Sequence, residues 1–138
     1  MMEKKRIIWV DDLFEGDYNL LECVEILSRE GFIVDVCTTV SDFMDKFNGE
    51  SKGYACAIID LVMPDPNTRG DFMNTGRNLI NQVRAISQDI NIIAYTHMTI
   101  DDDVQLEFEE KRVKYLYRRY PSNIVEVVKN TLNPKRDA

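Results

Sequence analysis

Short apolar runs alternate with longer segments of helical periodicity along the chain, and this alternation limits the possible fold more than any other feature. The apolar runs fall at residues 7–10, 32–37, 54–59, 90–95 and 113–117. Between them, and after the last one, apolar side chains recur every three or four residues, which is the spacing of one helix face. We therefore expect five strands, each followed by a helix.

Several of the expected helices have recognisable ends. The first leads to Gly31, which suits a C-terminal cap because glycine readily adopts left-handed backbone. Ser41 is the expected N-cap of the second helix, and Asn48 and Gly49 are its expected end. The fourth is expected as an acidic helix over about residues 100–112.

Strands that are apolar on both faces and separated by helices predict a parallel sheet covered on both sides. The expected fold is therefore α/β, a doubly wound five-stranded parallel sheet with helices on both faces. We expect one domain over residues 1–132 and a short polar tail over 133–138. In such a fold, ligands bind beyond the carboxyl ends of the strands, where the strand order reverses.

Composition excludes several classes of function. With 24 acidic and 17 basic residues, the formal net charge is -7, which argues against direct binding of nucleic acid. The apolar runs are too short to cross a membrane. Cys23, Cys37 and Cys56 are odd in number and lack the spacing of a zinc site, so we expect reduced core cysteines and a cytoplasmic protein.

Charged and polar residues gather where the expected strands end. Asp11 and Asp12 follow the first strand, Asp60 the third, Thr96 the fourth and Arg118 the fifth. Carboxylates held this close together repel one another unless a cation neutralises them. Mg²⁺ prefers such hard oxygen ligands and leaves coordination positions open for phosphate oxygens. The pattern predicts a magnesium site.

Four segments on these elements resemble the receiver domain of two-component response regulators. They are Trp-Val-Asp-Asp at 9–12, Ile-Ile-Asp-Leu-Val-Met-Pro-Asp at 58–65, Ile-Ala-Tyr-Thr at 93–96 and Tyr-Leu-Tyr-Arg at 115–118. The resemblance covers nearly the whole chain and implies the flavodoxin-like receiver fold, with strand order 2-1-3-4-5.

The resemblance also implies a phosphoacceptor chemistry. Asp60 would take a phosphoryl group from a phosphohistidine on a histidine kinase or histidine phosphotransfer protein. Asp12 would bind Mg²⁺ directly, Asp11 through water, and the Val62 backbone carbonyl would supply a further oxygen. The protein would be a signalling phosphoacceptor, one that assists its own phosphoryl transfer and dephosphorylation, rather than an enzyme.

The same resemblance implies a switch. Thr96 and Arg118 would hold the transferred group, and their movement would let Tyr115 rotate. The surface formed by the fourth helix, fifth strand and fifth helix would then change its affinity for a downstream protein target. We also expect Arg118 to pair with Asp60 before phosphorylation and to lower the pKa of that carboxyl.

The sequence departs from the receiver pattern at several positions. Arg118 stands where the family has Lys, Arg119 where Pro is common, and His97 where a small residue is usual. The 65–75 loop is longer than the family's turn, which indicates a tolerated insertion or a partner contact. Arg118 and His97 favour one alternative, a phosphorylation-independent pseudo-receiver that acts as a protein-interaction module.

Two other functions fit the residues less well. A haloacid-dehalogenase-type phosphatase would need an acidic residue two positions after Asp60, where this chain has Val62. A flavodoxin-like electron carrier would need a Ser/Thr-rich phosphate loop after the first strand, where residues 11–14 read Asp-Asp-Leu-Phe. Whether the receiver stands alone or belongs to a longer protein is left open by the sequence.

Overall fold

The computed structural model describes residues 4–16, 18–50, 53–64, 74–118 and 123–132. These residues form five parallel strands in the order β2-β1-β3-β4-β5, which confirms the expected topology. Arg119, the polar tail at 133–138 and nearly all of the 65–75 loop lie outside the described residues.

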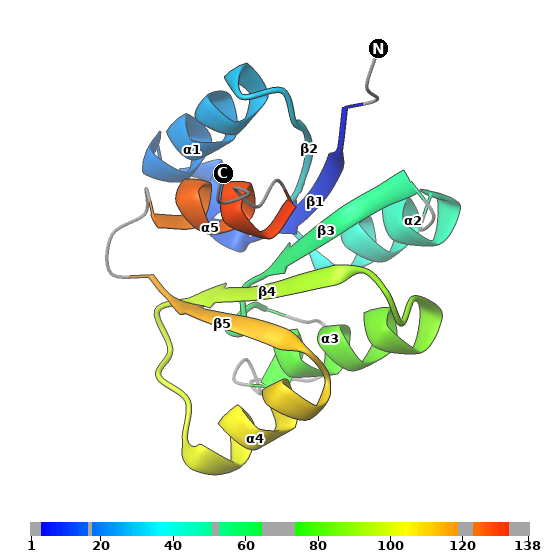
Figure 1. Cartoon of the computed structure of the whole chain (residues 1–138). Helices are drawn as coiled ribbons and strands as arrows, with labels where there is room; N and C mark the ends of the chain where they lie inside the picture. Colours follow the sequence, from blue (N-terminus) through cyan, green and yellow to red (C-terminus); the bar gives the residue numbers. More distant parts are fainter. Residues whose placement is uncertain (1–3, 17, 51–52, 65–73, 119–122, 133–138) are drawn as a thin grey trace, which may run out of the picture.

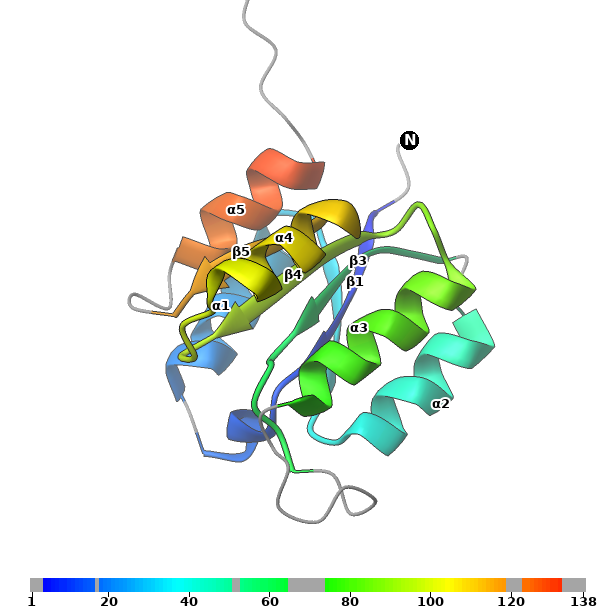
Figure 2. The same ribbon diagram turned by 90° about the horizontal axis from the view of Figure 1, so that it is seen from below.

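The strands are β1 Arg6–Val10, β2 Ile33–Cys37, β3 Tyr54–Ile59, β4 Asn91–Thr96 and β5 Val113–Tyr117. The helices are α1 Tyr18–Arg29, α2 Val40–Glu50, α3 Thr75–Ile86, α4 Asp102–Glu110 and α5 Asn123–Leu132, with a short 3₁₀ helix, η1, at Asp12–Glu15. Helices α1 and α5 cover one face of the sheet, and α2, α3 and α4 cover the other (Figures 1 and 2).

Each central strand supplies apolar side chains to both faces because successive residues of a strand point in opposite directions. In β1, Ile8 and Val10 pack into the core under α2, α3 and α4. Ile7 and Trp9 pack into the second core, under α1 and α5. All four side chains are fully buried. The expectation of strands buried on both faces is therefore confirmed for the central strands β1, β3 and β4, whereas the edge strands β2 and β5 are only partly buried.

Two expected helix ends are wrong and one is confirmed. Helix α2 begins at Val40 rather than after Ser41, because the Thr39 hydroxyl accepts the hydrogen bond from the Asp42 backbone N–H at 3.1 Å. The helix also continues through Gly49 and ends at Glu50. After α1, Gly31 has a φ of 101°, as its capping role requires.

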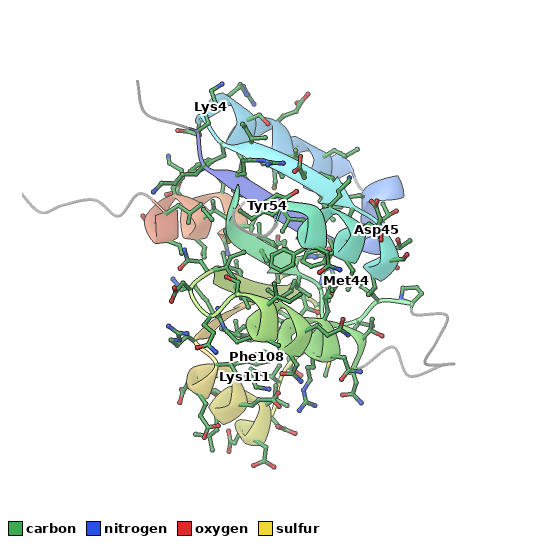
Figure 3. All side chains as sticks on the ribbon, turned by 90° about the vertical axis from the view of Figure 1, so that its right-hand side faces the viewer. Lys4, Met44, Asp45, Tyr54, Phe108 and Lys111 are labelled. Atoms are coloured by element: carbon green, nitrogen blue, oxygen red, sulfur yellow. The ribbon has the colours of Figure 1, made fainter. Side chains whose placement is uncertain are left out.

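The fourth helix is shorter than expected. It begins after Asp101, whose side chain accepts a hydrogen bond from the Val104 backbone N–H at 2.9 Å, and it ends at Glu110. Glu107 joins α4 to α3 through an ion pair with Arg77 at 3.1 Å, and it also pairs with Lys111 at 3.2 Å. Figure 3 labels Lys111 in the region where α3 and α4 lie side by side.

Among the described residues, none of the helices combines the length and the apolar character needed to cross a membrane.

Candidate functional site

The carboxyl ends of β1, β3, β4 and β5 bring together the polar residues that the sequence singles out. Asp11 directly follows β1 and Asp60 directly follows β3, on either side of the point where the strand order reverses. Thr96 ends β4, and Arg118 follows β5. These four residues are between 0% and 6% exposed. They form a buried polar site at the carboxyl edge of the sheet.

Three carboxylates converge at this site. One oxygen from each of Asp11, Asp12 and Asp60 lies within 4.8 Å of the others. Burial, and after it the charge of Asp11, raise the pKa of Asp60 from 3.8 to about 6. Hydrogen bonds from the Thr96 hydroxyl and from the Val62 backbone N–H, the latter at 3.2 Å, oppose this shift only in part.

The donor set at this cluster fits a hard divalent cation. It offers carboxylate oxygens, the ligands that Mg²⁺ prefers. Burial, followed by the negative charge of Asp11, disfavours the ionised form of Asp60 when no cation is bound. Asp12 is partly exposed and lies at the mouth of the site, where it is open to an incoming ion. The expected convergence of the three carboxylates is therefore confirmed.

Gly76 holds the start of α3 against the backbone of the acceptor segment. Its N–H donates to the Leu61 carbonyl at 3.1 Å. A Cβ atom at this position would lie 2.3 Å from the Asp60 carbonyl oxygen and 2.4 Å from the Leu61 Cα. Only glycine allows this approach, so the residue fixes the position of the Asp60 peptide.

The expected pairing of Arg118 with Asp60 is wrong. Arg118 Nη2 instead donates to Asp11 Oδ2, in an ion pair whose two side chains are 1% and 0% exposed. The same nitrogen donates to the Tyr95 carbonyl at 3.1 Å. Arg118 is therefore only a minor influence on Asp60, and the pKa of that carboxyl is raised rather than lowered.

Tyr95 is a site residue that the sequence analysis did not identify. The guanidinium carbon of Arg118 lies 4.4 Å from the centroid of the Tyr95 ring, a cation–π geometry. Trp9 packs edge-on against the same ring, with 5.8 Å between centroids. An aromatic residue next to a strand-end Thr was the only sequence signal for this contact, and it is also typical of an ordinary core position.

An open cavity of about 580 Å³ lies beside Asp60. It is lined by Asp12, Asp60, Val62, Thr96, His97, Met98 and Thr99. His97 is exposed on this wall, whereas Arg118 and Asp11 lie outside it. A group that enters the cavity therefore meets Asp60 and Thr96 directly, whereas Arg118 does not line the cavity.

Tyr115 connects this site to another surface. Its hydroxyl donates to the Met98 carbonyl at 2.6 Å, in the segment that follows Thr96. The Met98 backbone N–H in turn donates to Thr96 Oγ1 at 3.2 Å. Tyr115 also lines a groove of about 530 Å³ between α4 and β5, together with Phe108 and Tyr117. A short chain of contacts thus links Thr96 to that groove.

Comparison with known proteins identifies the fold. No protein-family model matches the sequence, and no curated protein matches it. Among solved structures, a CheY-like receiver domain protein from Methanospirillum hungatei is 21% identical, with a TM-score of 0.74 and 94% of each chain covered. The non-phosphorylated HemR receiver domain from Leptospira biflexa is 17% identical, with a TM-score of 0.76, 98% of this chain covered and 99% of that one.

A third structure shows a receiver with ligands bound. It is the response regulator TrrA from Thermotoga maritima in complex with Mg²⁺ and BeF, which is 24% identical, with a TM-score of 0.68, 93% of this chain covered and 99% of that one. The strand order, the position of the acidic cluster and these likenesses agree. The chain has the fold of the response-regulator receiver domains.

Proposed function

We propose that this chain is the phosphoacceptor receiver of a two-component or phosphorelay system. Asp60 takes a phosphoryl group from a phosphohistidine on a histidine kinase or histidine phosphotransfer protein. The observation that carries the proposal is the convergence of Asp11, Asp12 and Asp60 within 4.8 Å, with Asp60 on the wall of a cavity beside Thr96. The receiver fold of the structural neighbours supports it.

In the proposed reaction, an Asp60 carboxylate oxygen attacks phosphorus while the bond from phosphorus to the histidine nitrogen breaks. The product is an acyl phosphate, and the histidine leaves with a proton in place of the phosphoryl group. Asp12, Asp60 and the Val62 carbonyl would hold Mg²⁺, with Asp11 acting through water. Bound there, the ion would neutralise the charge that otherwise keeps the acceptor and the phosphoryl oxygens apart.

Thr96 and Arg118 have different tasks once the phosphoryl group is present. The Thr96 hydroxyl, which hydrogen-bonds Asp60 in this structure, would donate to a phosphoryl oxygen. Arg118 would have to leave Asp11 to reach the same group. Movement of Thr96 would pass through Met98 to Tyr115 and change the groove between α4 and β5 for a downstream protein target.

In this transfer the chain itself receives the phosphoryl group and converts no separate substrate. It therefore acts as a signalling component and not as an enzyme. Its cysteines at positions 23, 37 and 56 are buried in the core, and we place the protein in the reducing cytoplasm.

The mass of the intact protein after incubation with acetyl phosphate and Mg²⁺ tests the proposal. The wild type should gain one phosphoryl group, and an Asp60→Asn variant should gain none. Excess chelator should prevent the gain in the wild type. An adduct that persists in Asp60→Asn would place the chemistry elsewhere and contradict the assignment.

A second candidate function is the phosphorylation-independent pseudo-receiver. It is favoured by Arg118, which is bound to Asp11 and absent from the wall of the cavity. A pseudo-receiver would show no mass gain under any of these conditions, and its affinity for a protein partner would be the same in the wild type and in Asp60→Asn.

A further inference from the structure

Arg118 is held in place by several contacts and is not among the residues that line the cavity. It forms a buried ion pair with Asp11 and donates to the Tyr95 carbonyl, and its guanidinium lies over the Tyr95 ring. Its backbone N–H donates to the Thr96 carbonyl at 2.7 Å, which anchors the residue beside the end of β4. Because these contacts already restrict the Arg118 side chain, keeping it in this position costs little additional conformational entropy.

Asp11 therefore has two possible cationic partners. It belongs to the cluster of three carboxylates that could hold a metal ion, and it is also the anion of the Arg118 pair. Both partners would be attracted by the same negative charge on Asp11, whose side chain is fully buried. Such charges interact strongly because neither solvent nor salt screens them well.

We propose that Arg118 is a built-in counterion of the acidic cluster, which occupies Asp11 and weakens the binding of a divalent cation to the unphosphorylated protein. This inference rests on the proposed function only for the use of Mg²⁺ at this site. Divalent-cation binding and the Arg118–Asp11 pair oppose each other, so binding of the cation loosens Arg118 from Asp11. Arg118 is a positioning residue in this role, since it lies outside the wall of the cavity.

A purely structural role for Arg118 predicts something different. If the arginine only supports the fold, any replacement should loosen Asp11 and make metal binding weaker. If it acts as a counterion, a neutral side chain of similar reach should make metal binding tighter, because the cluster then carries one more uncompensated negative charge. The sign of the change in affinity separates the two roles.

The test is a titration with Mg²⁺ that follows Trp9 fluorescence in the full chain. Trp9 is fully buried and touches the Tyr95 ring on which Arg118 lies, so its emission should report changes at the pair. Arg118→Gln should bind Mg²⁺ at least about tenfold more tightly than the wild type, since an unscreened unit charge has been removed. Arg118→Lys keeps the charge and should remain within about threefold of the wild type.

Lys114→Gln is the matched control, because Lys114 lies in the same strand region but is exposed. This substitution changes the net charge by the same amount as Arg118→Gln does. Screening at physiological salt should nevertheless keep its effect on the affinity for Mg²⁺ below about twofold. An affinity for Mg²⁺ in Arg118→Gln that is equal to or weaker than that of the wild type overturns the proposal. Phosphorylation of Asp60 is measured separately by mass and would still stand in that case.

A measurement on the wild type covers the possibility that the variants fail to fold. Arg118 Nε is buried and has no hydrogen-bond partner among the described residues, so its N–H should give a protected signal in a nitrogen-15 NMR spectrum. Addition of Mg²⁺ should shift this signal with the same midpoint as the fluorescence change. A signal that stays unchanged while Mg²⁺ saturates the site would refute the proposal that Mg²⁺ and the Arg118 guanidinium compete for Asp11.

Discussion

Replacement of Asp60 by Asn should stabilise the protein at neutral pH in the absence of divalent cations. In the folded chain the pKa of Asp60 is raised from 3.8 to about 6, first by burial and then by the charge of Asp11. One pKa unit corresponds to about 1.4 kcal/mol, so ionised Asp60 lowers the free energy of unfolding by about 3 kcal/mol at pH 7 or above. Asn has nearly the same shape and carries no charge, and it should recover most of this loss.

The pH dependence has a definite sign. Between pH 3.8 and about 6 the folded protein binds more protons at Asp60 than the unfolded chain does, so stability falls as pH rises through this window. As the pH is lowered from 7 to 4, the free energy of unfolding of the wild type should therefore rise relative to that of Asp60→Asn, and the difference between the two proteins should shrink. Urea unfolding in a chelating buffer at several pH values measures this. An Asp103→Asn control, at an exposed position on α4, should change stability by no more than about 0.5 kcal/mol. A stability difference between wild type and Asp60→Asn that does not vary with pH would refute the argument.

Three further outcomes are expected. Gly76→Ala should lower the free energy of unfolding by at least about 2 kcal/mol, because the new methyl group meets backbone 2.3 Å away, whereas Gly49→Ala in open space on α2 should be neutral or stabilising by urea unfolding. Arg84→Ala should cost about 2 kcal/mol in the same assay, since its guanidinium donates to five carbonyls where α3 and α4 end and β4 begins. The phosphorylated protein should lose its phosphoryl group slowly, because Val62 on the cavity wall cannot orient water and His97 adds bulk there. The phosphorylated mass should disappear faster in Val62→Asn and His97→Ala than in the wild type. A wild type that loses it faster than both variants would contradict this.

The fold could be predicted because each strand carries its signal locally. The apolar runs at 54–59 and 113–117 coincide with the observed strands. The signal is clearest in β3, where five of the six residues are buried, because burial on both faces favours apolar side chains at successive positions. Helix ends were harder to predict, because neighbouring residues compete for the same role. Thr39 and Ser41 can both cap a helix, and only the path of the chain after β2 decides that Thr39 does so.

The site could be predicted only in part. The strand ends place Asp11 and Asp60 side by side because parallel strands end at one edge, so their convergence follows from the topology. The partner of Arg118 does not follow from topology. Its long side chain can reach either carboxylate, and the choice of Asp11 depends on the Tyr95 ring and carbonyl, which lie on the adjacent strand.

The most direct test of the central claim is to locate the acyl phosphate within the chain. After incubation with acetyl phosphate and Mg²⁺, reduction with borohydride converts a phosphorylated aspartate to homoserine, which peptide mass spectrometry can identify. We expect homoserine at position 60 in the wild type, and none at position 11 or 12. Homoserine at another aspartate, or none at any position despite a phosphorylated intact mass, would contradict the assignment of Asp60 as the phosphoacceptor.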